Sequence, residues 1–289
     1  MGIVLGDNRY GKAEVHLVRV DRGADRHGLT DVTVGVSLSG ELADVHLRGD
    51  NSNVLTTDAQ KNTVFAFAAE GVGQVEEFGL RLARHFVASQ PAIRRAEVRL
   101  TEQPWDRIEG SDGPAPHSFA RNGTCLRTAR VRVTADAAEV VSGLTGLTLL
   151  NTTDSEFWGF ATDRYTTLAE TRDRILATAV DAQWRHLSSD ADFGKSYPDV
   201  RRLLAAAFAE TYSYSLQQTL YAMGERVLAA HPEIAEIRLS LPNKHHFLVD
   251  LSPHDVENTD TVYYAADRPY GLIEGTVTRD DVAPSMMDW

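Results

Sequence analysis

Cysteine is almost absent from this chain of 289 residues, in which Cys125 is the only one. A single cysteine excludes an intramolecular disulfide and a zinc site built from several thiolates, and such usage is typical of a reducing compartment. Long apolar runs are also missing, and residues 1–12 lack the basic start and apolar core of a signal peptide. The sequence therefore predicts a cytoplasmic protein without a membrane-spanning segment.

Positive charge is scarce as well. The chain has 29 Lys and Arg against 41 Asp and Glu, a net charge of −12, and no basic cluster that could follow a phosphate backbone. This balance argues against nucleic acid as a partner. Hydrophobic residues make up 43% of the chain, which is enough to fill the core of one large domain or of two ordinary ones.

Both halves of the chain follow one order of patterns. In the first half, alternating segments at 14–20 and 31–38 predict a hairpin, and apolar residues at helical spacing predict a helix over 75–89. Strands are predicted over 95–101 and near 124–133. Helices following strands, and strands following helices, indicate an α+β fold with antiparallel sheets and helices on one face.

The second half repeats this order. Segments 138–150 and 162–167 are predicted as strand or loop, and helices are expected around 168–186 and 200–230. A Gln-Pro at residue 90 and a His-Pro at residue 231 each precede an alternating strand. The pattern predicts a tandem repeat, with a tail that is expected to be disordered. The predicted boundaries are 1–136, 137–279 and, for the tail, 280–289.

The stretch from Leu239 to Leu251 combines an apolar strand pattern with an amide, an ammonium group and two imidazoles. A strand that only filled a core would not carry so many polar groups. Because successive side chains of a strand point to opposite faces, Asn243 and His245 are predicted to share one face. His246 falls on the other face and is expected to be structural.

Six short motifs resemble those of the uricase (urate oxidase) family, and they occur in one order along residues 9–279. They are Tyr-Gly-Lys at 10–12, Thr-Asp-Ala-Gln-Lys-Asn at 57–62, Phe-Trp-Gly-Phe at 157–160, Asp-Arg-Ile-Leu at 173–176, the segment 212–221, and Leu-Pro-Asn-Lys-His at 241–245. The resemblance implies two tunnelling-fold (T-fold) repeats per chain and a homotetramer whose sheets close into a barrel. Closure would also protect the sheet edges that each repeat leaves exposed.

By this resemblance Lys12, Thr57 and His245 are the catalytic residues, and Thr57 and Asp58 also contact the substrate. The chemistry is reasonable, since a lysine removed from water binds its proton less tightly and a threonine hydroxyl can relay that proton. Read one at a time, Lys12 would be an ordinary surface lysine, Thr57 a helix N-cap and His245 a structural histidine. The paired motifs favour the catalytic interpretation.

The other site residues follow from the same resemblance. Phe157 is expected to stack on a purine, and Arg174 to clamp the purine edge with its planar guanidinium. Gln217, beside the backbone of Leu216, is expected to bind the opposite edge, and Asn243 to position oxygen or water. Three residues next to Phe157 and Arg174 are not expected to contact the substrate. Trp158 and Phe160 are predicted to be core residues, and Arg172 a surface residue. Gln218 competes with its neighbour for the amide role.

The resemblance implies the oxidation of urate by O2 and water to 5-hydroxyisourate and hydrogen peroxide without a cofactor. Lys12 and Thr57 would come from one subunit and the remaining residues from another. Two alternatives stay open: a T-fold enzyme acting on a pterin or another purine, and an oligomer that binds purines without oxidising them. The tail 280–289 lacks the Ser-Lys-Leu peroxisomal signal, which agrees with a bacterial-type cytoplasmic enzyme.

Overall fold

The computed structural model describes residues 2–23, 25–266 and 268–287, and the chain divides into two compact units. The first unit comprises the described residues up to 143 together with 185–195 and 283–287, and the second comprises 144–184 and the described residues of 196–282. Residues from both ends of the chain therefore belong to the first unit. The division into repeats at residues 136 and 137 stays a prediction.

The first unit contains an antiparallel sheet in the strand order β1-β2-β3-β6. Its strands are β1 (Tyr10–Asp21), β2 (Gly28–Gly40), β3 (Ile93–Gln103) and β6 (Leu126–Thr134). Alternate residues of β2, from Val32 to Leu38, are almost fully buried. This period of two places an apolar row on one face of the sheet and a polar row on the other.

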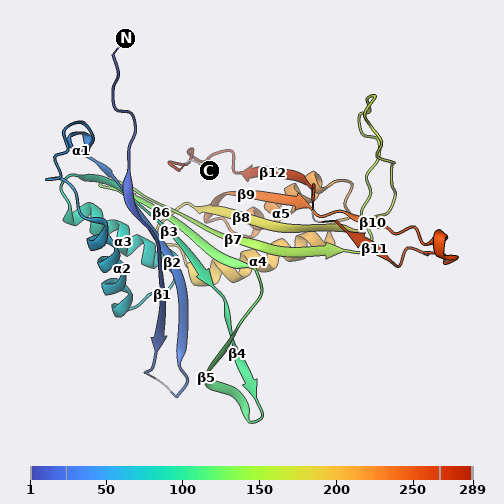
Figure 1. The fold of residues 1–289 in the computed structure, drawn as a ribbon, viewed down its shortest axis with the longest axis horizontal. Coiled ribbons are helices and arrows are strands. Elements are labelled where there is room, and N and C mark those ends of the chain that lie inside the picture. Colours follow the sequence, from blue (N-terminus) through green and yellow to red (C-terminus); the bar gives the residue numbers. More distant parts are fainter. Residues whose placement is uncertain (1, 24, 267, 288–289) are drawn as a thin grey trace. The chain divides into compact units, whose positions relative to one another are not determined.

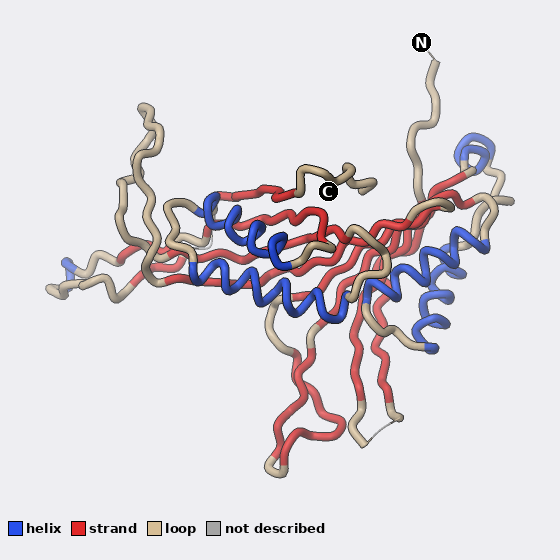
Figure 2. The backbone as a smooth tube through the Cα atoms, turned by 180° about the vertical axis from the view of Figure 1, so that it is seen from behind, coloured by secondary structure: helices blue, strands red, loops and turns tan. Residues whose placement is uncertain are grey.

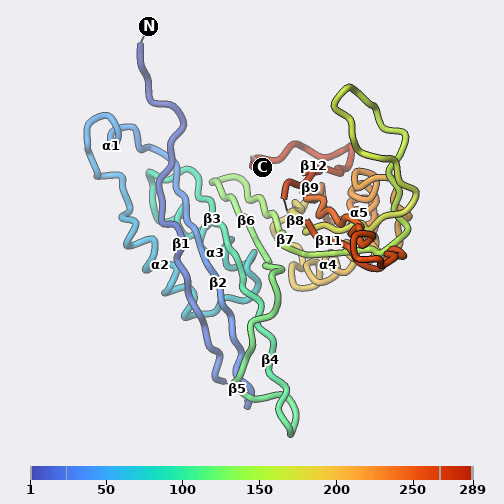
Figure 3. Tube along the Cα trace, turned by 45° about the vertical axis from the view of Figure 1, so that its right-hand side comes forward, coloured from blue at the N-terminus to red at the C-terminus, as the bar shows by residue number. Residues whose placement is uncertain are grey.

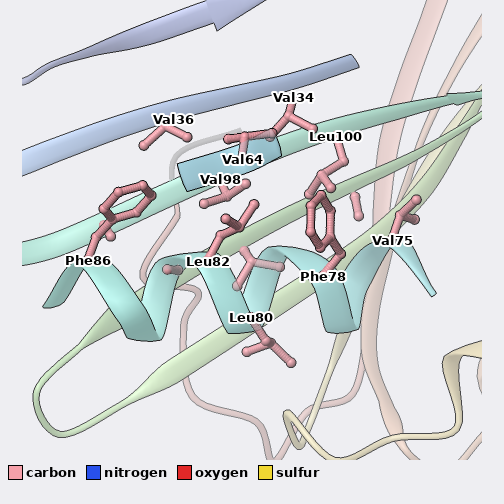
Figure 4. Packing of buried hydrophobic residues seen from close by; sticks show 14 of the residues in the cluster. Val34, Val36, Val64, Val75, Phe78, Leu80, Leu82, Phe86, Val98 and Leu100 are labelled. Carbon is pink, nitrogen blue, oxygen red and sulfur yellow. The ribbon is translucent and has the colours of Figure 1, made fainter. Parts of the chain in front are cut away.

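Helices α1 (Ala43–Arg48), α2 (Thr57–Glu70) and α3 (Val75–Ser89) belong to the first unit. α3 packs against β3 and β6, and α2 lies beside β1 (Figure 1). Figure 4 shows Phe78, Leu82 and Phe86 of α3 directed toward the apolar side chains of the strands. Helices on one face of this sheet confirm that part of the predicted α+β fold.

A hairpin that the sequence did not indicate joins β3 to β6. It consists of β4 (Trp105–Gly110) and β5 (Gly113–Arg121), and Figure 3 shows it continuing beyond the ends of those strands. Proline and exposed polar residues in this segment hid its alternation. The indole Nε1 of Trp105 donates a hydrogen bond of 2.9 Å to the buried Asp31, which ties the hairpin to β2.

In the second unit the strand order is β7-β8-β9-β12, and β9 and β12 pair antiparallel. The strands are β7 (Ala138–Asn151), β8 (Leu176–His186), β9 (Ile234–Asn243) and β12 (Gly271–Thr278), and β7 and β8 each continue into the first unit. Helix α5 (Leu216–Ala230) packs on β9 and β12, and it lies alongside α4 (Phe193–Glu210) in Figure 2. A short ladder of β10 (His246–Leu248) and β11 (Tyr263–Ala265), with the one-turn helix η1 (Ser252–His254) between them, completes the unit.

Two predictions of secondary structure in this unit are wrong. The helix expected around 168–186 is strand β8, in which buried Val180, Ala182 and Trp184 alternate with exposed Asp181 and Gln183. Alanine and arginine favour helices in isolation, but the period of two in burial decides the conformation. The helical region 200–230 is confirmed as two helices with a break at 211–215.

The strand predicted from Leu239 to Leu251 is also interrupted. β9 ends at Asn243, and pairing resumes only at His246, so the alternation that placed Asn243 and His245 on one face does not hold. The backbone N–H of Lys244 donates to the carbonyl oxygen of Ala177 at 2.8 Å, which bends the chain toward β8.

The tail contacts the first unit as far as Met287, and its disorder stays a prediction. The Ser285 hydroxyl donates a 2.7 Å hydrogen bond to Glu139, and Met287 is 4% exposed. Residues 288–289 of this tail lie outside the described residues. None of the helices described is long and apolar enough to cross a membrane. Closure of the sheets into a barrel stays a prediction.

Candidate active site

The Tyr-Gly-Lys segment opens β1 and lies against the loop that precedes α2. The hydroxyl of Tyr10 donates a 3.0 Å hydrogen bond to the carbonyl oxygen of Leu55. A side chain at Gly11 would clash with the carbonyl oxygen of Val36, so only glycine allows β1 to approach β2 so closely. Lys12 follows immediately and is half-buried. Backbone contacts on both sides therefore fix the position of Lys12.

Thr57 is the first residue of α2 and is not its N-cap. The N-cap is Thr56, whose Oγ1 accepts a 3.1 Å hydrogen bond from the backbone N–H of Ala59. The interpretation of Thr57 as a cap is therefore wrong. Because Thr56 performs the capping, the half-buried hydroxyl of Thr57 is available for other chemistry.

Asp58 lies in the first turn of α2, where the charge of Lys12 acts on it. Its carboxylate accepts hydrogen bonds from Lys61 at 2.6 Å and Asn62 at 3.0 Å. The Lys61 hydrogen bond holds the pKa of Asp58 below its ordinary value, and the nearby charge of Lys12 lowers it further. The structure thus brings Lys12 within electrostatic reach of Asp58 and its neighbour Thr57. These three predicted residues form one group in the first unit.

A cavity of about 300 Å³ adjoins this stretch of β1. It lies where Gly11 and Gly35 leave the sheet without side chains, and it is bordered by the polar residues Glu97 and Arg99. Glu97 accepts hydrogen bonds from Arg99, Arg130 and Arg132, and these guanidinium groups outweigh its burial, so that its pKa is lowered to about 2. The wall of the cavity is therefore rigid and charged.

In the second unit, Phe157 is fixed by backbone pairing. Its N–H donates to the carbonyl oxygen of Thr171 at 2.9 Å, and the N–H of Thr171 donates back at 2.9 Å. Its ring stacks on Phe160, with 5.0 Å between centroids and 18° between planes. Both rings are half-buried, so Phe160 supports Phe157 but is not the core residue that the sequence predicted. This geometry gives a planar ring in a defined orientation.

Arg174 lies beside that ring. Its Cζ is 5.1 Å from the centroid of Phe157, and its Nε donates a 3.2 Å hydrogen bond to the hydroxyl of Ser155. Burial lowers the pKa of Arg174, but a guanidinium stays protonated in proteins. Because Nε already donates to Ser155, the two terminal nitrogens of the guanidinium remain as the parallel donors that match a planar anion.

Ser155 is a site residue that the sequence did not reveal. It is fully buried, and it bridges to Ser213 in the loop before α5. The N–H of Glu156 donates to the carbonyl oxygen of Ser213 at 2.7 Å. Serine occurs in many roles, so only the bond to Arg174 identifies this one. The same short segment thus positions Phe157, Arg174 and the start of α5.

Trp158 is not a core residue, contrary to the prediction. It is 44% exposed, its Nε1 donates a 2.5 Å hydrogen bond to Glu156, and the Cζ of Arg172 lies 3.7 Å from its ring centroid. Glu156 also accepts a 2.6 Å hydrogen bond from the hydroxyl of Tyr212. Arg172 is exposed as predicted, but it packs on the indole instead of extending freely into solvent.

Gln217 and Gln218, the two candidates for the amide role, differ in their contacts. Gln218 uses its Oε1 to accept a 2.8 Å hydrogen bond from the backbone N–H of Tyr214, which holds the loop before α5. Gln217 is exposed in the first turn of that helix, and Leu216 beside it is buried. The side-chain oxygen of Gln218 is thus engaged within the chain, and the assignment of the amide role to Gln217 stays a prediction.

His245 lies in the break between β9 and β10. Burial lowers its pKa, and the charge of Arg174 and the neighbouring His246 lower it further. Its ring stacks on Phe247 with 5.7 Å between centroids. The electrostatic contact places His245 near Arg174, so Phe157, Arg174 and His245 form a second group. Asn243, at the end of β9 and paired with Gly271, is half-buried.

No group of three or more His, Cys, Asp or Glu within the described ranges is arranged to hold a metal ion. The predicted site residues of the first unit are instead a lysine, a threonine and an aspartate, and the second unit offers an arginine, a histidine, two amides and an aromatic ring. Such a set can hold a planar anion and move protons.

Comparisons with known proteins extend over both halves of the chain. A sequence model described as Uricase matches residues 8–132 and 140–274. The uricase of Arthrobacter globiformis is 50% identical over 278 residues, which cover 96% of this chain and 91% of that protein. The uricase of Aspergillus flavus is 38% identical over 291 residues, which cover 95% of this chain and 96% of that protein.

Solved structures agree with these matches. The crystal structure of uricase from Arthrobacter globiformis superposes with a TM-score of 0.94 at 49% identity, over 99% of this chain and 98% of that one. A mutant urate oxidase of Bacillus sp. TB-90 gives a TM-score of 0.83 at 26% identity. All six sequence motifs fall inside the matched ranges. This chain therefore belongs to the uricase family.

Proposed function

We propose that this protein oxidises urate, with O2 and water, to 5-hydroxyisourate and hydrogen peroxide. Urate loses two electrons and gains the oxygen of a water molecule, while O2 takes up two electrons and two protons. Family membership supports the reaction class. The observation that carries the assignment is the guanidinium of Arg174, held by Ser155 5.1 Å from the ring of Phe157 and electrostatically close to His245.

In this proposal the purine stacks on Phe157 while Arg174 and Gln217 bind its two edges. The guanidinium favours the anionic form of the substrate, because two parallel N–H donors match adjacent acceptors on the ring. The overall charge of −12 gives no long-range attraction for an anion, so local positive charge must provide it. Leu216 offers its backbone next to Gln217, and Asn243 positions O2 or water above the ring.

Lys12, Thr57 and His245 move the protons. The lowered pKa of His245 favours a neutral imidazole near pH 7, and a neutral ring can accept a proton. Thr57 is free of capping and can both donate and accept, so it can pass a proton between Lys12 and a bound water. Asp58 keeps its negative charge beside Lys12 and also contacts the substrate.

No cofactor is required in this mechanism, because the electron-rich purine anion supplies the electrons to O2 itself. Cytoplasmic location and the absence of any nucleic-acid or membrane partner remain predictions from composition.

The first test is an oxygen electrode with purified, chelator-treated protein, while the absorbance of urate is followed. Equal consumption of oxygen and urate, with release of peroxide, is the expected result. Binding of urate without consumption would favour a purine-binding protein, and absence of binding would redirect the search to pterins. Either of these outcomes would contradict the proposal.

The active site is proposed to form between subunits of a homotetramer, with Lys12 and Thr57 from one chain and the remaining residues from another. Mixing an inactive Lys12→Met variant with an inactive Arg174→Gln variant should then restore activity, because some interfaces combine two intact halves. Mass spectrometry of differently labelled chains measures subunit exchange independently. Exchange without recovery of activity would show that each site lies within one chain.

Ser155 is expected to act through Arg174. In Ser155→Ala the guanidinium loses its Nε partner, and affinity for a non-oxidisable xanthine analogue should fall about tenfold, the usual effect of one hydrogen bond to a charged group. Ser155→Thr keeps the hydroxyl and serves as the matched control. In an Arg174→Gln background, Ser155→Ala should cause no further loss. An equal loss in both backgrounds would reveal a general structural effect instead.

A further inference from the structure

β1 contains an irregularity directly after Lys12. Lys12 pairs with Val36 of β2, and Val15 pairs with Val34, so two residues of β1, Ala13 and Glu14, lie opposite the single residue between the two valines. This is a β-bulge. Glu14 has a φ of 56°, in the left-handed region that non-glycine residues rarely adopt.

The bulge changes which face of the sheet the start of β1 presents. Residues paired directly across an antiparallel sheet point to the same face. Val34 and Val36 are 0% and 4% exposed and belong to the core under α2 and α3, as Figure 4 shows. Lys12, paired with Val36, therefore shares the helix-covered face with Val15.

Regular alternation would give the opposite result. Counting back from Val15 in steps of two reaches Ala13 and Gly11, so an unbroken strand would turn Lys12 and Tyr10 to the other face. The burial pattern shows that the alternation shifts by one residue at the bulge. After the bulge the inward-facing residues are Val15 and Leu17, and before it the half-buried residues are Tyr10 and Lys12. The intervening Ala13 and Glu14 are both exposed.

One hydrogen bond and one electrostatic effect support the orientation independently of the pairing. The hydroxyl of Tyr10 reaches the carbonyl oxygen of Leu55, in the loop that leads into α2. The charge of Lys12 contributes to the lowered pKa of Asp58, in the first turn of α2. Both partners belong to the helix side of the sheet.

We propose that the phase of β1, which the bulge at Ala13 and Glu14 sets, keeps Lys12 opposite Val36 and so turns it toward Thr57 for the proton relay. This inference rests on the proposed function, in which Lys12 and Thr57 act together. What the inference requires is a spacing between Lys12 and Val15 that keeps Lys12 opposite Val36. The side chains of Ala13 and Glu14 are not required.

The test compares deletions of one and two residues. Removal of Glu14 leaves one residue between Lys12 and Val15, so both valine pairings and the facing of Lys12 are kept. The kcat for urate should stay within about tenfold of the parent. Removal of both Ala13 and Glu14 places Lys12 opposite Gly35, on the other face, and kcat should fall to the level of Lys12→Met.

A rescue variant separates orientation from damage to the fold. In the double deletion, exchanging the order of Gly11 and Lys12 (Gly11→Lys with Lys12→Gly) returns a lysine to the position opposite Val36, and kcat should rise at least tenfold. Glu14→Gly, which suits the left-handed backbone, should keep full activity and unchanged or higher thermal stability. Circular dichroism and the affinity for the xanthine analogue report whether each variant is folded.

Three outcomes would overturn the inference: a folded double deletion as active as the single deletion, a rescue variant without recovery, or a folded single deletion as inactive as Lys12→Met. If the double deletion does not fold, the single deletion still tests the inference, because a folded single deletion as inactive as Lys12→Met would overturn it. Full activity of Lys12→Met would instead refute the role of Lys12 in the proposed function, whatever the deletions show.

Discussion

Replacement of Lys12 by methionine is expected to lower kcat by about 10²–10⁴-fold, the usual contribution of a general acid or base. Methionine fills a similar volume but cannot carry a proton. Binding of a non-oxidisable xanthine analogue should change little, because Lys12 acts on protons and not on the purine edges. Steady-state kinetics with urate and calorimetry with the analogue measure the two effects. Equal losses in kcat and in affinity for the analogue would contradict the assignment of Lys12 to the proton relay.

Lys195→Met provides the matched control for Lys12→Met, since Lys195 is an exposed lysine near the start of α4.

The two threonines at the start of α2 are expected to have opposite effects when each is replaced by alanine. Thr57→Ala should lower kcat strongly with little loss of stability. Thr56→Ala should lower the unfolding free energy by about 1 kcal/mol, the cost of losing an N-cap, while kcat stays close to the parent value. If the two threonines exchanged these effects, Thr57 would be the structural residue.

Arg174→Lys is expected to weaken binding of the xanthine analogue about 30- to 100-fold. Lysine keeps the positive charge but loses the planar fork, so it cannot form two parallel hydrogen bonds with the purine edge. It also loses the Nε–H that donates to Ser155. Calorimetric titration of the analogue measures the change directly, without interference from the oxidation step.

Arg172→Lys is the control for that substitution. Arg172 is two residues away and also packs on an aromatic ring, that of Trp158, but its side chain is exposed and pairs with Glu156. Affinity for the analogue should stay within about twofold of the parent, because exposed ion pairs contribute little. Unchanged affinity in Arg174→Lys would remove Arg174 from the proposed clamp.

Much of the fold followed from periodicity alone. The hairpin of β1 and β2, helix α3 and strand β3 were each predicted close to their observed bounds, because one face of each is buried and repeats at a regular interval. β8 was mistaken for a helix, since alanine-rich sequence favours helices until burial on a sheet overrides propensity.

The site residues were predicted from motifs, and the reasons for their arrangement were not visible in them. Read alone, Thr57 resembles an N-cap, because caps depend on backbone angles that a sequence does not display; the neighbouring Thr56 fills that position. Ser155 gave no signal, since its role consists of one hydrogen bond to a residue 19 positions later in the chain.

Sequence by itself determined the α+β class and the family resemblance, and it nominated the candidate site residues, because these depend on residue types and local spacing. Tertiary structure decided which of these side chains face one another. Lys12 shares a face with Val36 only because two residues of β1 lie opposite one residue of β2. Gln218 uses its side-chain oxygen to hold the backbone of Tyr214, a contact that its position beside Gln217 does not reveal. Such choices depend on strand register and on hydrogen bonds between segments, which no local pattern encodes.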